Sequence, residues 1–207
     1  MSGRRTPGSP GYRLLVEYKR PDHYTRQAKA AGYAARSVFK LDEIAAKTHA
    51  VPRQGRALDL GCFPGSWSRW LIERGLTVVG VDLSEPAVSG GSWIARSVYD
   101  VTVEELREAL GGPADIVVSD MAPNTSGNRF TDHVRQIQLA DRALELATAL
   151  LRPGGSFVVK VFDGGDAPAY TERVRARFAE VKRLKPDATR DRSVEFFLAA
   201  KGFRPPG

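Results

Sequence analysis

Short apolar segments alternate with amphipathic helical segments along most of this chain, and this order restricts the fold more than any other feature. Four apolar segments end at a turn or a charged residue and are typical of buried strands: 56–61, 77–82, 115–120 and 156–162. Helical segments precede, separate or follow them, at 22–48 (interrupted near Gly32), 66–75, 102–112, 131–151 and 168–180. Strand–helix alternation predicts a mostly parallel sheet with helices on both faces.

The last part of the chain breaks this alternation. Two apolar segments, 181–185 and 194–200, follow each other without a helix between them. Adjacent strands with a short connection pair antiparallel, so we expect one antiparallel strand at an edge of the sheet. We expect a single α/β domain over 21–207, preceded by a flexible basic segment over 1–20.

Composition excludes several classes of protein. Cys62 is the only cysteine, so the chain cannot form an internal disulfide, and its three histidines show no metal-ligand spacing. No segment approaches the roughly 20 apolar residues of a membrane helix, and the first residues lack the apolar part of a signal peptide. We therefore expect a cytoplasmic protein that uses neither a metal nor a membrane, and a monomer is compatible with its size.

Charge is distributed unevenly along the sequence. Residues 1–40 hold nine Lys/Arg and two Asp/Glu, a net charge of +7, and residues 173–193 hold eight and three, a net charge of +5. The middle of the chain, 41–172, is acidic, with twelve basic and eighteen acidic residues. Clustered basic charge favours a polyanion such as nucleic acid, although a solvated basic tail gives the same composition.

Chemically active residues stand at the carboxyl ends of the predicted strands. Asp59, Asp82 and Asp120 end or nearly end the first three strands, and Lys160 lies near the end of the fourth. Ligands of open α/β sheets bind at this edge, so we expect these four residues to share a site.

The turn "DLGCFPG" after the first strand indicates a nucleotide-type ligand. Gly61 and Gly65 allow the backbone to approach a ligand closely, but neither G-x-G-x-x-G nor a P-loop is present. Carboxylates without basic residues suit the cationic S-adenosylmethionine better than NAD, and Asp82 is placed to accept hydrogen bonds from a ribose. Trp67 serves either as a ligand wall or as ordinary helix packing, and we expect Cys62 to be a small core residue.

Lys160 stands in the otherwise apolar segment "SFVVKVF". A buried ammonium is costly unless it is paired or loses its proton. One interpretation is a general base, since burial and a second nearby cation both favour the neutral amine. The other is a lysine with a buried stem whose ammonium reaches solvent at the end of the strand.

Five segments resemble the FtsJ/RrmJ (RlmE) family of large-subunit ribosomal RNA ribose 2′-O-methyltransferases. They are "DHYTRQAKAAGYAARSVFKLDEI", "LDLGCFPGSWS", "VVSDMAPNTSG", "RPGGSFVVKVF" and "KPDATRDRSVEFFLAAKG", in the family's order over residues 22–202. The resemblance implies a Rossmann-like S-adenosylmethionine-dependent fold with seven strands, of which one is antiparallel. It also implies methyl transfer to ribosomal RNA in the large ribosomal subunit, at a uridine in bacterial members.

The same resemblance assigns roles to residues. By motif match, the family's catalytic set falls on Lys40, Asp120, Lys160 and Glu195. Its cofactor positions fall on Gly65, Trp67, Asp82, Asp100 and Asp120, and Asp59, Gly61 and Pro64 belong to the same loop motif. Two places depart from the family: Ser66 replaces a glycine, and 83–99 matches poorly, which weakens the assignment of Asp100.

Arginines near the matched motifs are the expected RNA contacts: Arg26, Arg36, Arg190 and Arg192. Three other functions stay open. One is 2′-O-methylation of transfer RNA, and another is a non-catalytic RNA-binding ribosome-assembly factor on the same fold. The third, a NAD-dependent enzyme, lacks its expected glycine motif.

Overall fold

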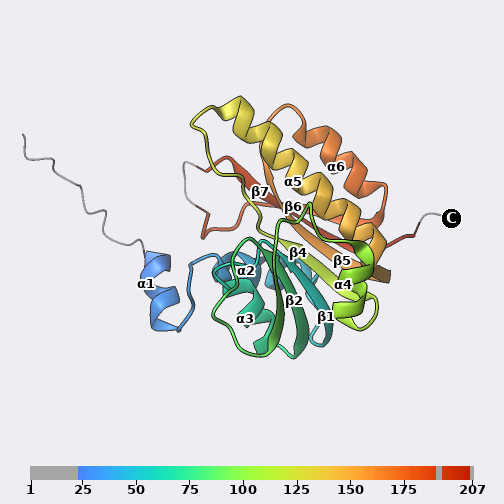
Figure 1. Cartoon of the computed structure of the whole chain (residues 1–207). Coiled ribbons are helices and arrows are strands. Elements are labelled where there is room, and N and C mark those ends of the chain that lie inside the picture. Colours follow the sequence, from blue (N-terminus) through green and yellow to red (C-terminus); the bar gives the residue numbers. More distant parts are fainter. Residues whose placement is uncertain (1–22, 190–192, 206–207) are drawn as a thin grey trace, which may run out of the picture.

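A computed structural model describes residues 23–189 and 193–205, so the segment 1–20 and both Arg190 and Arg192 lie outside the described residues. Seven strands form one sheet in the order β3-β2-β1-β4-β5-β7-β6 (Figure 1). Their bounds are β1 Gly55–Leu60, β2 Leu76–Asp82, β3 Gly91–Ala95, β4 Ala114–Ser119, β5 Leu151–Phe162, β6 Phe178–Leu184 and β7 Glu195–Phe203. The first five strands are parallel to one another, as the alternating pattern predicts.

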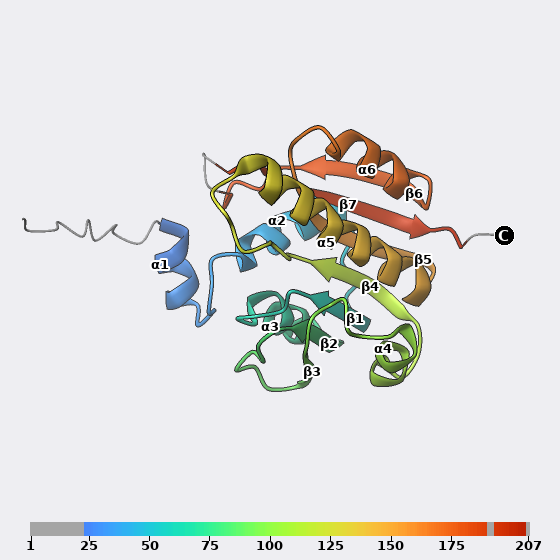
Figure 2. The ribbon, with the colours of Figure 1, turned by 45° about the horizontal axis from the view of Figure 1, so that its top comes forward.

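Six helices accompany the described sheet: α1 His23–Ala30, α2 Val38–Thr48, α3 Ser66–Glu73, α4 Val103–Leu110, α5 Arg129–Leu150 and α6 Ala167–Arg175. Two separate apolar clusters show which helices cover which face. One joins α4, α5 and α6 to the sheet, and the other joins α2 and α3 to its opposite face. Helix α1 extends away from the body of the molecule beside α2 (Figures 1 and 2). Among the described residues, no helix combines the length and apolarity needed to cross a membrane.

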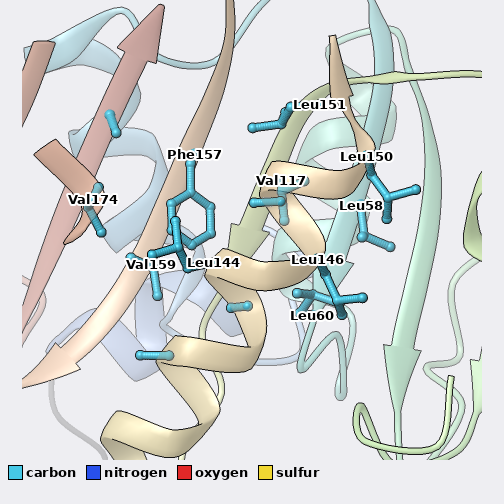
Figure 3. Close-up of a cluster of buried hydrophobic side chains, with 14 of the residues drawn as sticks. Leu58, Leu60, Val117, Leu144, Leu146, Leu150, Leu151, Phe157, Val159 and Val174 are labelled. Atoms are coloured by element: carbon cyan, nitrogen blue, oxygen red, sulfur yellow. The ribbon is translucent and has the colours of Figure 1, made fainter. Parts of the chain in front are cut away.

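The larger cluster fills the space between α5 and the sheet. Leu58, Val117 and Phe157 project from three neighbouring strands toward Leu146 and Leu150 of α5 (Figure 3). Each of these side chains is at most 1% exposed. Burying a side chain of this size stabilises a fold by about 1.5–3 kcal/mol, so this face of the sheet holds the strand ends firmly in position.

The expected place of the antiparallel strand is wrong. β7 runs antiparallel to both of its neighbours but lies between β5 and β6, so the edge strand is β6. Burial explains this order. Five consecutive residues of β7, Phe196 to Ala200, are buried, whereas most residues of β6 are exposed. A strand that is apolar on both faces belongs inside a sheet.

Strand β3 was not predicted from the sequence. It spans only five residues at the other edge of the sheet, and none of them is fully buried. Its glycine and serine give no alternation of apolar and polar residues, so the pattern resembles a loop. The structure places it parallel to β2, with Asp82 opposite Ala95.

Candidate active site

The carboxyl ends of β4 and β5 bring Asp120 and Lys160 together. Ser119 is in register with Val159, so the two residues that follow lie side by side. The Lys160 ammonium donates a hydrogen bond to Asp120 Oδ1 at 3.1 Å and another to the Asp120 carbonyl oxygen. Lys160 is only 6% exposed. Its ammonium therefore does not escape to solvent at the end of the strand but is held by two acceptors of one residue.

A second ion pair joins α2 to β7. The Lys40 ammonium donates to Glu195 Oε1, and both side chains are largely buried, at 10% and 13% exposure. These two residues are 155 positions apart in the sequence, so only the folded sheet brings them into contact. The two lysines thus come from different elements, Lys40 from α2 and Lys160 from β5. Each is paired with its own carboxylate.

Phe197 connects the two ion pairs. It lies directly across from Lys160 in the antiparallel pairing of β5 with β7, so the two side chains project from the same face. The Lys40 ammonium lies 5.5 Å from the centroid of the same ring, within the range of a cation–π contact. Phe197 therefore adjoins the lysine of each ion pair, one through the strand pairing and the other through its ring.

Gln136 fixes the strand that carries Lys160, and sequence reasoning missed it. Its amide donates to the Lys160 carbonyl at 2.6 Å and its carbonyl accepts from the Phe162 amide at 2.9 Å, across a buried contact between α5 and β5. The available signal was a glutamine one position before Ile137, on the helix that faces the sheet. Phe197 was also missed, because an aromatic residue in an apolar strand gives no sign of its partner.

A cavity of ≈ 390 Å³ lies next to Asp120 at the ends of β1, β2 and β4. Its size is within the range of roughly 300–1,000 Å³ found for small-molecule sites. The residues that line it come from the end of β2, from the loops after β1, β2, β3 and β4, and from α5: Gly61, Phe63, Val81, Asp82, Leu83, Arg96, Ser97, Val98, Tyr99, Asp120, Met121, Ala122, Pro123, Asn124 and Leu139. Asp120 therefore belongs both to this cavity and to the ion pair with Lys160.

Two positions in the first loop require glycine. Gly61 has φ +81°, and an added Cβ would lie 2.7 Å from Met121 Cγ. Gly65 has φ +104°, and an added Cβ would lie 2.5 Å from Val88 Cγ2. Both positions combine a left-handed backbone with a close neighbour, which only glycine tolerates. The loop accordingly presents bare backbone toward the cavity at Gly61.

Asp59 is fully buried beneath this loop. Burial raises its pKa to about 7, partly opposed by a hydrogen bond that Ser68 Oγ donates to Oδ2 at 2.6 Å. The charges of Asp120 and Asp82 raise the pKa further. Its other oxygen, Oδ1, has no hydrogen-bond partner.

Asp82 shapes the opposite wall. Its Oδ2 accepts a hydrogen bond from the Phe63 amide at 3.0 Å, and its Oδ1 accepts a longer one from the Ser84 amide at 3.4 Å. The carboxylate thus ties the loop after β1 to the loop after β2 while still lining the cavity.

Several expected cofactor residues do not line the cavity: Asp59, Pro64, Gly65, Trp67 and Asp100. Asp100 is exposed, and the chain reaches the cavity at Arg96–Tyr99 instead. Trp67 is 3% exposed; its indole donates to the Ser37 carbonyl at 2.7 Å and packs on Phe197 with ring centroids 5.8 Å apart. Trp67 therefore occupies the packing role that the sequence had left open.

The remaining expectations concern the arginines proposed as RNA contacts, the single cysteine and metal binding. Arg26 is exposed on α1 and Arg36 is partly buried before α2, whereas Arg190 and Arg192 lie outside the described residues. Cys62 is buried, and burial strongly raises the pKa of its thiol, which makes it a core residue rather than a nucleophile. Within the described residues, no group of three or more His, Cys, Asp or Glu side chains has the arrangement of a metal site.

Comparison with known proteins adds a family to this geometry. The model of the FtsJ-like methyltransferase family matches residues 33–203. A Desulfosudis oleivorans protein named ribosomal RNA large subunit methyltransferase E is 46% identical over 187 residues, which cover 87% of this chain and 89% of the relative. An Acidiphilium cryptum protein of the same name is 43% identical over 187 residues, which cover 89% and 83%.

Solved structures share the fold. A Plasmodium falciparum protein described as a ribosomal RNA methyltransferase superposes with a TM-score of 0.75 at 24% identity, over 84% of this chain and all of the other. A Burkholderia thailandensis 1,6-didemethyltoxoflavin-N1-methyltransferase, solved with S-adenosylhomocysteine, has a TM-score of 0.56 at 17% identity, over 87% and 84%.

Proposed function

The chain belongs to the FtsJ-like methyltransferase family, and from this membership we propose that it methylates a ribose 2′-hydroxyl of large-subunit ribosomal RNA, using S-adenosylmethionine. The observation that carries the proposal is the pair of Lys–carboxylate contacts, Lys160–Asp120 and Lys40–Glu195, beside a ligand-sized cavity. The names of the curated relatives support the RNA substrate, and the basic ends of the chain supply affinity for its phosphates.

The cavity residues fit the proposed cofactor. Asp82 and Asp120 line it, and carboxylates suit both a ribose and a nearby cation. The Gly61 backbone approaches without a side chain, and the apolar faces of Leu83 and Val98 can flank an adenine ring. When bound, S-adenosylmethionine supplies a methyl group on a positively charged sulfur.

The chain itself must remove a proton from the attacking hydroxyl. We assign that step to Lys160, since its nitrogen lies against Asp120 at the border of the cavity. A general base of this kind contributes about 10²–10⁴-fold to a rate. For this step the Lys160 ammonium must first release one proton to solvent, because only the neutral amine can accept a proton. The amine then takes the hydroxyl proton as the oxygen attacks, while Asp120 orients it.

We assign the positioning of the target ribose to Lys40 and Glu195. Their groups are held by each other and by Phe197, so their orientation is set before substrate binds. Both ion pairs are largely buried, so little water competes for them. A ribose that forms a hydrogen bond with Lys40 or Glu195 leaves the two charges next to each other, so neither charge loses its partner. The ribose then binds to groups whose orientation is already set.

Purified protein and labelled S-adenosylmethionine test the proposal. Three acceptors that lack the modification are compared: large ribosomal subunits, naked ribosomal RNA and transfer RNA. Label that survives as a 2′-O-methylnucleoside after digestion, from either ribosomal acceptor, supports the proposal. Label on transfer RNA alone would show that the substrate is transfer RNA and not ribosomal RNA. Binding of S-adenosylmethionine without label on any acceptor would favour an RNA-binding assembly factor. We also propose a cytoplasmic location, because the proposed substrate is part of the ribosome.

A further inference from the structure

The large apolar side chains that remain exposed all lie at the active-site edge of the sheet. Among the described residues they are Phe63, Leu83, Tyr99, Phe130 and Val194. The first four stand after the carboxyl ends of the parallel strands β1 to β4, and Val194 immediately precedes β7 at the same edge. Single exposed apolar residues are ordinary, but their gathering around one site indicates a partner with apolar faces.

Three of these residues belong to the cavity already described. Phe63, Leu83 and Tyr99 line it, so the cofactor site accounts for their exposure. Phe130 and Val194 do not line the cavity, and they are 75% and 49% exposed. Phe130 is the most exposed large apolar side chain in the described part of the chain, and the proposed mechanism gives it no role.

Phe130 is held firmly in spite of its exposure. It stands in the first turn of α5, where the Asn128 side chain accepts hydrogen bonds from the amides of Phe130 and Thr131, at 3.0 and 3.1 Å. The buried Asp132 accepts from the amide and hydroxyl of Ser126, at 2.7 and 2.8 Å. The cap and this second contact fix the start of the helix. The ring is therefore presented on a defined helix terminus.

The position of this turn relates Phe130 to the catalytic residues. His133, one turn further along the same side of α5, packs so closely on Gly164 that an added Cβ there would lie 2.5 Å from its ring. The neighbouring Asp163 donates its amide to the Val194 carbonyl at 2.8 Å. His133, three residues after Phe130, and Val194 thus both contact the segment that follows β5, just beyond Lys160. In Figures 1 and 2 the start of α5 lies on the same side of the molecule as α1.

We propose that Phe130 stacks on an unpaired base of the RNA whose ribose is presented to Lys160, with Val194 as an apolar contact. This inference rests on the proposed function. Nucleobases are flat apolar groups on an anionic backbone, and the exposed ring adjoins Arg129 with Arg135 further along the same helix. Aromatic side chains commonly take up splayed bases in this way, whereas a base inside a duplex offers no free face.

The first test compares two RNAs of equal charge: a single strand of about 12 nucleotides and the same ribose-phosphate chain without bases. Phe130→Leu keeps an apolar side chain but removes the aromatic ring, and Phe130→Tyr keeps the ring. We expect Phe130→Leu to raise the Kd for the base-containing RNA about tenfold and to leave the Kd for the abasic chain unchanged. Phe130→Tyr should bind both RNAs like the wild type.

Equal binding of the base-containing RNA by Phe130→Leu and the wild type would overturn the proposal. A similar loss for both RNAs would overturn it as well, because the ring would then act through charge or folding. Loss of binding to assembled subunits alone would indicate a protein contact and would also contradict base stacking. Thermal unfolding should be unchanged, since the ring is exposed.

Methylation separates this proposal from the function on which it rests. On naked ribosomal RNA, Phe130→Leu should raise KM several-fold with little change in kcat, whereas Lys160→Ala should lose kcat. An active wild type whose KM is insensitive to Phe130→Leu would remove the stacking role and keep the methyltransferase. A wild type without activity on any RNA would refute the function, and the binding comparison would still report on Phe130.

Discussion

Phe197 lies directly across from Lys160 in the antiparallel pairing of β5 and β7. Because the Lys40 ammonium lies 5.5 Å from the centroid of the same ring, one aromatic residue adjoins both lysines of the site. Trp67 packs on Phe197, and its indole donates to the Ser37 carbonyl just before α2. The lysines that we assign to the reaction thus each have a carboxylate partner and adjoin the same aromatic residue.

We predict that Phe197→Leu lowers kcat by about tenfold or more while the protein stays folded. The smaller side chain removes the support of both amines, and small displacements of reacting groups cost large factors in rate. Phe157→Leu is the matched control, because Phe157 is equally buried in the sheet but belongs to the cluster on the opposite face. Both variants should lose a similar free energy of unfolding. Equal kcat values for the two variants would refute the supporting role of Phe197.

The Lys40–Glu195 pair should show strong energetic coupling. Lys40→Met and Glu195→Gln each leave one largely buried charge without its partner, which costs about 1–3 kcal/mol of unfolding free energy. The double variant removes both charges, so its cost should be smaller than the sum of the two, by about 2 kcal/mol. Denaturant unfolding of the wild type, the two single variants and the double variant measures this coupling free energy.

An exposed ion pair provides the control for that cycle. Arg173 and Asp141 join α6 to α5 with side chains 47% and 46% exposed. Water screens such a pair, so its coupling should fall between about 0 and 1 kcal/mol. Coupling of Lys40 with Glu195 no larger than that of this surface pair would contradict a preorganised buried pair.

Asp59 should make stability depend on pH. Its folded-state pKa, about 7, exceeds the ordinary value of 3.8, so the folded protein binds an extra proton between these pH values. The stabilising contribution of the protonated form is complete below pH 4 and is lost as pH rises to about 7, by about 1.4 kcal/mol per pH unit. Asp59→Asn cannot titrate and should lack this component.

Denaturant unfolding between pH 5 and pH 8 measures the difference. The free energy of unfolding of Asp59→Asn, relative to wild type, should increase from pH 5 to pH 7 and stay constant above. Parallel curves for the two proteins across this range would show that Asp59 is ionised in the folded state.

The proposed cofactor site gives different roles to Asp82, which lines the cavity, and Asp100, which does not. Asp82→Asn should raise the Kd for S-adenosylmethionine about tenfold, because a carboxylate that lines the cavity loses its charge and one of its two acceptor groups. Asp100→Asn should leave this Kd within about twofold, since Asp100 is exposed and does not line the cavity. Calorimetric titration of both variants decides; a weaker affinity in Asp100→Asn would restore the role that the family resemblance implies.

Most of the fold could be predicted because its signals are local. Alternating apolar and amphipathic segments predict β1, β2, β4 and β5 with their helices, and the short connection between β6 and β7 predicts their antiparallel pairing. The internal position of β7 depends on burial on both faces, which becomes visible only when the neighbouring strands are known. β3 is too short and too exposed to give a period.

The residues of the site also differ in how far local sequence patterns reveal them. Lys160 can be identified from the sequence because a lysine is unusual in an apolar strand. Asp120 can be identified because it follows the end of a strand. Lys40 and Glu195 resemble ordinary charged residues in the sequence, and only the family motifs single them out. Gln136 and Phe197 act through contacts made across the folded sheet, which no local pattern encodes. Asp100 directly follows 83–99, the segment of poor resemblance, and residues at the end of that segment, Arg96–Tyr99, line the cavity.

Methyl transfer by wild type and Lys160→Ala, on large ribosomal subunits and naked ribosomal RNA, tests the central claim most directly. Calorimetry with S-adenosylmethionine and thermal unfolding first establish that the variant binds the cofactor and folds. We predict label at a ribose 2′-oxygen with the wild type, and a rate at least about 100-fold lower with Lys160→Ala. A folded Lys160→Ala variant that methylates at near wild-type rate would show that Lys160 is not the base.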